Sequence, residues 1–254
     1  MLLAEQVILL TGGSTGIGRE CARAYAREGA IVAICALDDR ELRRAADELG
    51  SPHSAYACDV SQSGQVASAV SEILSRYGRI DVVHNNAGIA GPSEPLERTT
   101  IDEWNELFAV NVQGILHTTQ CCFESLRQSR GCILNTSSVV GEMGQAAHAA
   151  YAATKGAVNA LTRSMALDYA PYGIRVNAVC PAGVWTPMLR KWAQSQPDPS
   201  GIHSYLNSIH PLGDCPEGDV VADASVFLVS KQARFITGHL MHVTGGAELG
   251  YRRI

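Results

Sequence analysis

The sequence predicts an α/β fold in which one doubly wound parallel sheet of about seven strands carries helices on both faces. Short β-branched runs alternate with longer segments of helical periodicity along all 254 residues. The short runs are almost continuously apolar, as expected of parallel strands that are buried on both faces. No linker, repeat or low-complexity tract divides the chain, so we expect a single domain over residues 1–254.

Seven short segments have the composition of buried strands, and helical segments separate them. They are residues 7–10, 31–36, 55–58, 81–84, 132–135, 175–179 and 239–243. Right-handed crossovers bring the carboxyl ends of parallel strands to one edge of the sheet, where open α/β sheets bind ligands. We therefore expect functional residues just after these segments.

Six longer segments are predicted to be helices, because apolar residues recur in them at helical spacing. They are residues 16–28, 39–49, 62–77, 101–127, 151–169 and 217–228. Thr100 and Glu103 form a capping box that starts the fourth of these helices. Residues 186–214 break the alternation with four prolines and no sustained strand. Their place after the sixth strand predicts a long irregular lid over the substrate.

The composition is that of a globular protein, with 46% apolar residues, 18% charged residues and a net charge of −5. No basic stripe indicates a nucleic-acid partner. No apolar run approaches the ~20 residues of a membrane span, and the first residues lack the positive region of a signal peptide. We expect a cytoplasmic protein without a membrane partner. Eight scattered cysteines without a C-x-x-C pair, and eight histidines without an H-x-x-x-H pair, predict reduced thiols and no metal site.

The most informative pair is Tyr151 and Lys155, which lie four residues apart. That spacing is one helical turn, so both side chains share a face. A free phenol titrates near pH ~10, and an ammonium group beside it favours the phenolate and lowers that pKa. The pair predicts a proton donor and acceptor for an alcohol, although the same spacing also occurs on solvated helix surfaces.

A glycine cluster lies between the first predicted strand and the first predicted helix, in Thr11-Gly12-Gly13-Ser14-Thr15-Gly16-Ile17-Gly18. Glycines let the backbone turn tightly and approach a pyrophosphate, and the helix N-terminus offers free N–H groups to its phosphates. The position at a strand-to-helix junction is the context that a dinucleotide site requires.

These features together resemble the short-chain dehydrogenase/reductase family over essentially the whole chain. The matching motifs are Gly12-x3-Gly16-x-Gly18, Asp59-Val60, Asn85-Asn86-Ala87-Gly88, Asn111, Ser138, Tyr151, Lys155 and Pro181-Ala182-Gly183-Val184-Trp185-Thr186. The resemblance implies a Rossmann-like domain that binds NAD(P). It also implies an oxidoreductase that interconverts a secondary alcohol, or a sugar hydroxyl, and a carbonyl by hydride transfer.

The resemblance also implies the residues that bind the cofactor. They are Gly12, Ser14, Thr15, Gly16, Ile17, Gly18, Asp38, Asp59, Val60, Asn86, Ala87, Gly88, Tyr151, Lys155, Val184 and Thr186. The glycine loop would hold the pyrophosphate, and Asp59 and Val60 the adenine. Val184 and Thr186 would fix the nicotinamide amide.

Four catalytic residues follow from the same resemblance. Tyr151 would exchange the proton, and Lys155 would lower its pKa and hold the nicotinamide ribose. Ser138 would form a hydrogen bond with the substrate oxygen. The neighbouring Ser137 is the alternative for this role, and the family spacing favours Ser138. Asn111 lies inside a predicted helix close to a glycine, which suits a local kink and a water-mediated proton relay. The alternative for Asn111 is a capped or solvated side chain.

The cofactor is expected to be NAD, with NADP as the alternative. An acid at the end of the second strand binds the ribose 2′-OH and repels a 2′-phosphate, but Ala36 occupies that place in the family register. Asp38 and Asp39 follow closely and can take the role of the acid. Arg40 can instead reach the 2′-phosphate of NADP. NADP enzymes of the family usually carry Arg or Lys just before Gly16, and this chain has the uncharged Thr15 there.

Residues 184–187 and 243–251 resemble the subgroup that contains 17β-hydroxysteroid dehydrogenase type 14 and L-fucose dehydrogenase. This resemblance places Gln145, Trp185 and Tyr251 around the substrate, together with Ser138 and Tyr151. A sugar such as L-fucose is favoured, and the alternatives are a 17β-hydroxysteroid and the substrate of an NADPH-dependent ketoreductase. For Trp185 the alternative is packing under the lid. A non-catalytic cofactor-binding protein is disfavoured, because the serine, tyrosine and lysine are all present.

The family resemblance suggests a homotetramer packed through residues 101–127 and 151–169. Small residues, among them Ala149, Ala153 and Ala160, permit close approach of a second subunit there. They can equally pack on the protein's own sheet.

Overall fold

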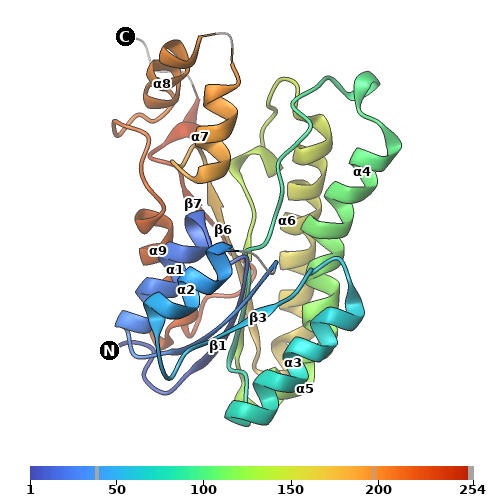
Figure 1. Ribbon diagram of the computed structural model, residues 1–254, viewed down its shortest axis with the longest axis vertical. Coiled ribbons are helices and arrows are strands. Elements are labelled where there is room, and N and C mark those ends of the chain that lie inside the picture. Colours follow the sequence, from blue (N-terminus) through green and yellow to red (C-terminus); the bar gives the residue numbers. More distant parts are fainter. Residues whose placement is uncertain (38–39, 197, 251–254) are drawn as a thin grey trace.

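The computed structural model describes residues 1–37, 40–196 and 198–250. Its centre is one seven-stranded parallel sheet with the order β3-β2-β1-β4-β5-β6-β7 (Figure 1). The strands are β1 (Val7–Thr11), β2 (Ile31–Ala36), β3 (Ser54–Ala57), β4 (Val82–Asn85), β5 (Cys132–Thr136), β6 (Arg175–Pro181) and β7 (Leu240–Val243). This confirms the predicted doubly wound α/β fold.

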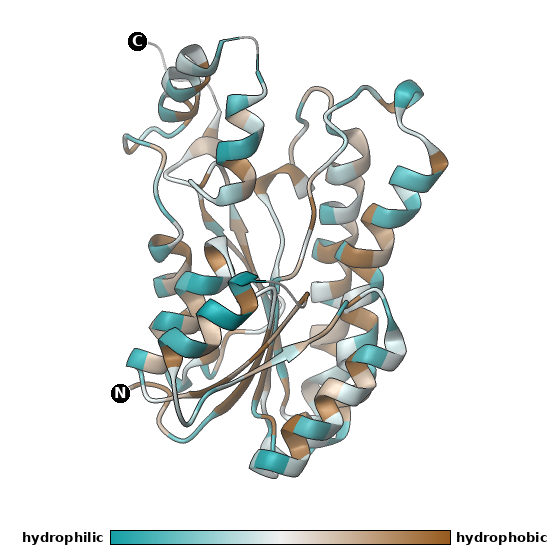
Figure 2. Ribbon diagram, viewed as in Figure 1, coloured by the Kyte–Doolittle hydropathy of each residue, from teal (hydrophilic) through white to brown (hydrophobic). Residues whose placement is uncertain are grey.

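Helices cover both faces of the sheet. One layer contains α1 (Gly16–Arg27), α2 (Arg40–Leu49) and α9 (Asp219–Val229), and the other contains α3 (Ser63–Tyr77), α5 (Gly114–Ser129) and α6 (Ala149–Tyr169) (Figure 1). Each layer closes its own core, and the hydrophobic residues follow the strands and the inward helix faces (Figure 2).

Successive residues of the central strands point into opposite cores. In β1, Ile8 and Leu10 belong to the core beneath α1, whereas Val7 and Leu9 belong to the core beneath α3 and α5. This explains why the strands are continuously apolar in sequence. Burying one such side chain contributes about 1.5–3 kcal/mol, so the sheet is a rigid platform for residues at its carboxyl edge.

The single helix expected over residues 101–127 is interrupted. The capping box of Thr100 and Glu103 starts α4 (Ile101–Phe108) as predicted. A wide π-helical turn, Ala109–Gln113, follows before α5 begins at Gly114. A Cβ on Gly114 would lie 2.9 Å from Cγ2 of Val60, so the glycine permits close packing there. The helix is thus irregular at Asn111, where the sequence predicts a local kink.

Residues 186–214 differ from the irregular segment that the prolines predicted. They contain two helices, α7 (Pro187–Gln194) and α8 (Pro199–Ser208). Pro187 and Pro199 are the first residues of these helices, where the missing N–H of a proline costs nothing. Pro211 lies in the turn that follows α8. Thr186 and Asp198 cap the two helices by accepting from backbone N–H groups. The backbone N–H of Trp185 donates to the carbonyl of Pro216 at 2.8 Å and so closes the base of this excursion.

Within residues 1–37, 40–196 and 198–250, no helix combines the length and apolarity that crossing a bilayer requires. The eight cysteines carry free thiols, and all but Cys121 are buried. In the same described part of the chain, no group of three His, Cys, Asp or Glu side chains is placed to hold a metal ion.

Candidate active site

The glycine loop between β1 and α1 approaches its neighbours so closely that side chains are excluded. Gly12 and Gly16 have φ values of +64° and +53°, a region that glycine adopts without strain. A Cβ on Gly18 would lie 2.1 Å from the carbonyl oxygen of Gly12. Thr15 precedes α1, but its side chain makes no capping hydrogen bond. The first N–H groups of α1 are therefore available to an anion.

Asn86 ties the end of β4 to this loop. Its Nδ2 donates to the carbonyl oxygens of Thr11 and Gly12 at 3.1 and 3.2 Å. The Thr11 hydroxyl accepts from the backbone N–H groups of Asn86 and Ala87 at 3.0 Å. Ser14 and Gly18 are buried in the same loop, while Ile17 and Gly88 are partly exposed at its rim.

Tyr151 and Lys155 lie on α6, and Lys155 Nζ stands 5.6 Å from the centre of the Tyr151 ring. Burial raises the pKa of Tyr151 to about 12, while a hydrogen bond with Ser138 acts in the lowering direction. Burial lowers the pKa of Lys155 to about 8. The ammonium of Lys155 donates to the backbone oxygen of Thr136 at 2.8 Å.

The structure therefore departs from the sequence argument, which expected the pKa of Tyr151 to be lowered by Lys155. Burial disfavours the charged phenolate, and here its effect on the pKa of Tyr151 outweighs that of the hydrogen bond with Ser138. Ser138 contacts Tyr151, whereas the hydroxyl of Ser137 donates to Asn159 Oδ1 at 2.6 Å. Of the two serines, Ser138 is therefore the one that interacts with Tyr151.

Asn111 projects from the π-helical turn and is fully hydrogen-bonded. Its Oδ1 accepts from the N–H of Ile89, and its Nδ2 donates to the carbonyl of Ile89, both at 2.9 Å. A second Nδ2 bond, of 3.1 Å, reaches the hydroxyl of Thr154. A Cβ on Gly88 would lie 3.2 Å from Asn111 Oδ1 and 3.7 Å from Lys155 Nζ. Asn111 is therefore buried between the β4 loop and α6, and the solvated alternative is wrong.

The remaining residues that were predicted to bind the cofactor lie at the same edge of the sheet. Thr11, Val60 and Ala87 lie together around one small hollow with Asn85 and Gly114. Asp59 accepts from the backbone N–H and the hydroxyl of Ser61 at 2.9 and 2.8 Å. Val184 is buried at the end of β6. Thr186 packs on the glycine loop, since a Cβ on Gly16 would lie 3.2 Å from its Cγ2.

The residues expected around the substrate are less closely gathered. Gln145 is exposed in the loop before α6. The ring of Trp185 stacks on His203 of α8 with centroids 4.4 Å apart, and the Arg190 guanidinium lies 5.1 Å from its centre. Trp185 thus packs against the two lid helices, as in the alternative reading of this residue. Asp38, Asp39 and Tyr251 lie outside the described residues.

Sequence reasoning missed two threonines of this site. The backbone oxygen of Thr136 holds Lys155, and the hydroxyl of Thr154 holds Asn111. A backbone acceptor has no signature in the sequence. Thr154 offered only its position, one residue before the lysine.

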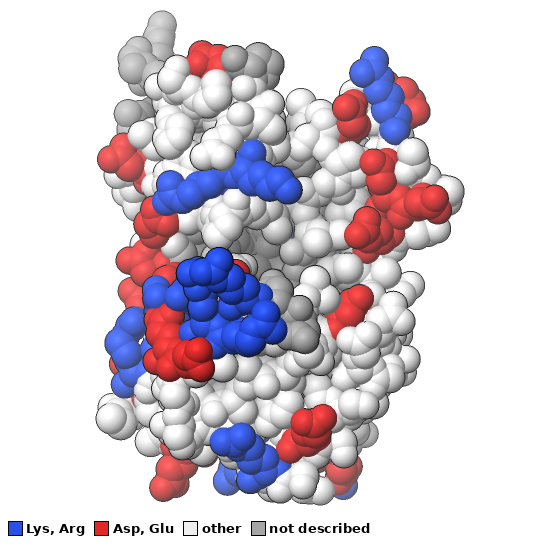
Figure 3. All heavy atoms as spheres, in the orientation of Figure 1, with Lys and Arg blue, Asp and Glu red and all other residues white. Residues whose placement is uncertain are grey.

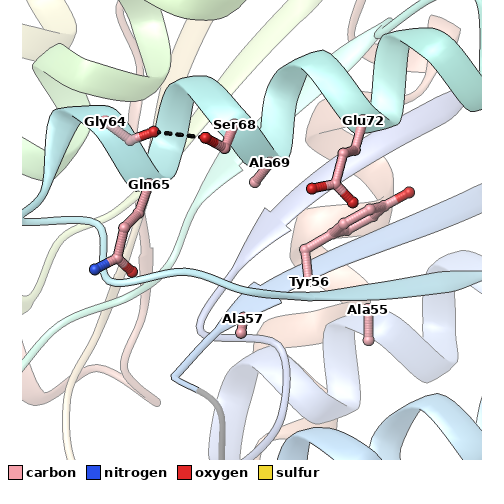
Figure 4. A pocket seen from close by; sticks show the side chains of 8 residues that line it. All are labelled: Ala55, Tyr56, Ala57, Gly64, Gln65, Ser68, Ala69 and Glu72. Carbon is pink, nitrogen blue, oxygen red and sulfur yellow. Dashed lines mark hydrogen bonds between the residues drawn. The ribbon is translucent and has the colours of Figure 1, made fainter.

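A larger hollow of about 420 Å³ opens elsewhere, between β3 and α3 (Figure 4). Tyr56 and Glu72 face each other across it, and Gln65 and Ser68 project from the first turns of α3. Strands β2, β1 and β4 separate β3 from β5, which leads to Ser138. None of the residues gathered above lines this hollow, so the candidate site is the carboxyl edge of the sheet.

The family model described as enoyl-(acyl carrier protein) reductase matches residues 12–248, from the first loop glycine to beyond β7. The chain belongs to the short-chain dehydrogenase/reductase family. As a member of this family it is an oxidoreductase that acts on CH–OH groups and binds a nicotinamide dinucleotide. The site fits that cofactor, because the glycine loop leaves a cradle that side chains would fill and a helix N-terminus for phosphates.

The short-chain dehydrogenase/reductase relatives include sugar dehydrogenases. The chain is 42% identical to L-fucose dehydrogenase of Bos taurus over 98% of this chain and 92% of that protein. It superposes on aldohexose dehydrogenase of Thermoplasma acidophilum with a TM-score of 0.90 and 33% identity, covering 99% and 97% of the two chains. With 3-ketoacyl-(acyl-carrier-protein) reductase of Brucella melitensis, in complex with NADH, the TM-score is 0.89 at 32% identity, covering 96% and 99%.

Proposed function

We propose that the protein is an NAD-dependent dehydrogenase of a sugar hydroxyl, with L-fucose as the favoured substrate. The observation that carries the reaction is the group of partly buried Tyr151 with buried Lys155 and Ser138, at the carboxyl edge of the sheet. The similarity to L-fucose dehydrogenase along nearly the whole chain supports the sugar.

When bound, the nicotinamide supplies hydride transfer at the substrate carbon. We assign proton transfer to the phenol oxygen of Tyr151 and substrate positioning to the hydroxyl of Ser138. With a pKa of about 12, Tyr151 is protonated at neutral pH and is ready to act as an acid in carbonyl reduction. Alcohol oxidation requires a lower pKa, which the Ser138 hydrogen bond and the positive charge of Lys155 favour.

Lys155 and Asn111 are assigned supporting roles. The ammonium of Lys155 is anchored on Thr136 close to Gly88, where it can hold the cofactor ribose. Asn111 fixes the loop after β4 through both backbone groups of Ile89. We assign it the positioning of a proton relay that leads from Lys155 toward solvent.

The preference for NAD rests on the end of β2. Ala36 ends this strand and brings no positive charge to the place where a 2′-phosphate would lie. Arginines do gather over α1 and α2 (Figure 3), which keeps NADP as the alternative. Arg19 of this group is paired with Glu48 at 2.6 Å, so its charge is already compensated.

The test is absorbance of the reduced nicotinamide, with NAD and NADP separately, across aldoses and one 17β-hydroxysteroid. We expect turnover of L-fucose with NAD. Tyr151→Phe should lower turnover by about 10²–10⁴-fold and leave cofactor binding in place. Activity retained in this variant would remove Tyr151 as the acid/base. Turnover of the steroid alone, or with NADP alone, would overturn the substrate or the cofactor assignment.

We also propose a cytoplasmic homotetramer that packs through α4, α5 and α6. Ala149, Ala153 and Ala160 are exposed along α6, and Ile101 and Leu116 are exposed on α4 and α5. Such small and apolar surface residues allow close helix packing between subunits. Sedimentation equilibrium of the wild type and of Ala153→Arg measures the assembly, and a wild-type monomer would contradict it.

A further inference from the structure

A second buried polar group lies behind the site, on the side of the sheet that α1 covers. His84 is the third residue of β4 and is fully buried. Its Nδ1 stands 2.9 Å from the hydroxyl of Tyr25 on α1, which is also fully buried. Its Nε2 stands 3.0 Å from the hydroxyl of Thr136 at the end of β5. None of these contacts is used by the proposed proton transfer.

The hydrogen bonds of Asn86 fix the direction of the whole chain of contacts. Because Asn86 Nδ2 donates to the carbonyls of Thr11 and Gly12, its Oδ1 faces Thr136 and accepts from that hydroxyl at 3.2 Å. Thr136 has then given its proton away and accepts from His84. His84 therefore carries its proton on Nε2, and Nδ1 accepts from Tyr25.

The imidazole is neutral in this arrangement. Burial lowers the pKa of His84 to about 3, far below neutral pH. A neutral ring with one donor and one acceptor satisfies both neighbours, so no buried polar atom of the ring is left unpaired. The direction of the hydrogen bonds from Tyr25 through His84 and Thr136 to Asn86 is therefore the same at any pH well above 3.

Thr136 connects these hydrogen bonds to the candidate active site. Its side chain links His84 to Asn86, and its backbone oxygen accepts from Lys155 at 2.8 Å. Asn86 in turn holds the carbonyls at the beginning of the glycine loop. Through Thr136, the side chain of His84 thereby influences both the glycine loop and the backbone oxygen that accepts from Lys155.

We propose that His84 is a positioning residue, whose Nε2–H sets Thr136 and Asn86 and through them the nicotinamide cofactor site. The inference rests on the proposed function, because it concerns the affinity of that site. The proposal predicts that loss of the hydrogen bond from Nε2 to Thr136 weakens cofactor binding. Loss of the hydrogen bond between Nδ1 and Tyr25 affects only the packing of α1.

Two substitutions distinguish the hydrogen bond of Nε2 from that of Nδ1. The amide of His84→Gln reaches as far as Nε2 and can still donate to Thr136. The shorter amide of His84→Asn reaches only as far as Nδ1. A second pair uses an isosteric change: Thr136→Val removes the link to Asn86, and Thr118→Val removes a fully buried hydroxyl that donates to Asn85 Oδ1 at 2.6 Å.

Dissociation constants for NAD and NADH are measured by quenching of tryptophan fluorescence, with urea unfolding of each variant alongside. This readout needs no substrate. We expect His84→Asn and Thr136→Val to raise the dissociation constants roughly tenfold, the effect of about one lost buried hydrogen bond. His84→Gln should restore them to within about twofold of the wild type, and Thr118→Val should lose stability without losing affinity.

Equal dissociation constants in His84→Asn and the wild type would overturn the inference and leave the proposed function standing. The same holds if the affinity losses simply follow the losses of stability, Thr118→Val included. A wild type that binds neither nucleotide would overturn the proposed function, and the inference would fall with it.

Discussion

A Cβ atom on Gly18 would lie 2.1 Å from the carbonyl oxygen of Gly12. The first turn of α1 therefore rests directly on the backbone of the loop that precedes it. The same Cβ would lie 2.5 Å from Nδ2 of Asn86, which holds that loop from the other side. Loop, helix and β4 meet at a point where no side chain fits.

Gly18→Ala is expected to damage cofactor binding more than any other single methyl group added to the glycine loop. Because the clash is with backbone, the loop must shift, and the dissociation constant for NAD should rise by more than about tenfold, with a loss of about 1–3 kcal/mol in stability. Fluorescence titration and urea unfolding measure both quantities.

The matched control for this change is Gly64→Ala in the first turn of α3. A Cβ there meets nothing within 4 Å, and alanine favours the helix by about 0.5–1 kcal/mol. Its affinity for NAD should equal that of the wild type. A Gly18→Ala enzyme that binds NAD normally would show that the loop tolerates the shift.

Ala36→Arg is expected to move the cofactor preference toward NADP. The structure confirms that Ala36 is the last residue of β2, and a guanidinium there can pair with a 2′-phosphate. The ratio of kcat/KM for NADP to that for NAD should rise by about tenfold or more, in line with one charge-assisted contact.

The control reverses the charge, since Ala36→Glu should repel the phosphate and move the ratio the other way. Initial rates at subsaturating cofactor give both ratios. If both variants shift the ratio in the same direction, the ribose lies elsewhere.

Lys155→Met is expected to change how stability depends on pH. Burial lowers the pKa of Lys155 from 10.5 to about 8, so between these values the unfolded chain holds a proton that the folded protein has released. Stability then rises with pH over this window, by about 3 kcal/mol in all. Below about pH 8 both states are protonated and the full cost of the buried ammonium remains.

Urea unfolding of wild type and variant at pH 7 and pH 10.5 measures this dependence. Wild-type stability minus that of Lys155→Met should increase by about 3 kcal/mol between the two pH values. A difference that does not vary with pH would mean that Lys155 is solvated. The variant should also lose cofactor affinity and turnover.

Strand and helix positions were largely predictable, because burial on both faces leaves a clear apolar pattern in β1, β2 and β5. The break at Asn111 was also predictable, since an amide and a nearby glycine disfavour a regular helix. The lid was not. Prolines such as Pro187 and Pro199 predict an irregular chain, but a proline at the first helical position, after a capping residue, starts a helix instead.

The proximity of the candidate site residues was predictable where it follows from a sequence motif. Tyr151, Lys155 and Ser138 lie together as expected. The direction of the Tyr151 pKa shift was wrong, because it depends on how deeply α6 is buried, and a motif does not encode burial. His84 was read only as the end of a strand. Its partners Tyr25 and Thr136 are 59 and 52 residues away in sequence.

The hydrogen bond from Trp185 to Pro216 pins the two ends of the α7–α8 excursion to each other. The number of residues between these ends can change with little change in the entropy of closing the loop, because that entropy grows only slowly with loop length. The segment that contains α7 and α8 can therefore be exchanged as a unit. Grafting residues 187–215 from a relative, with Thr186 kept on the glycine loop, would exchange the lid helices and leave Tyr151, Lys155 and Ser138 in place.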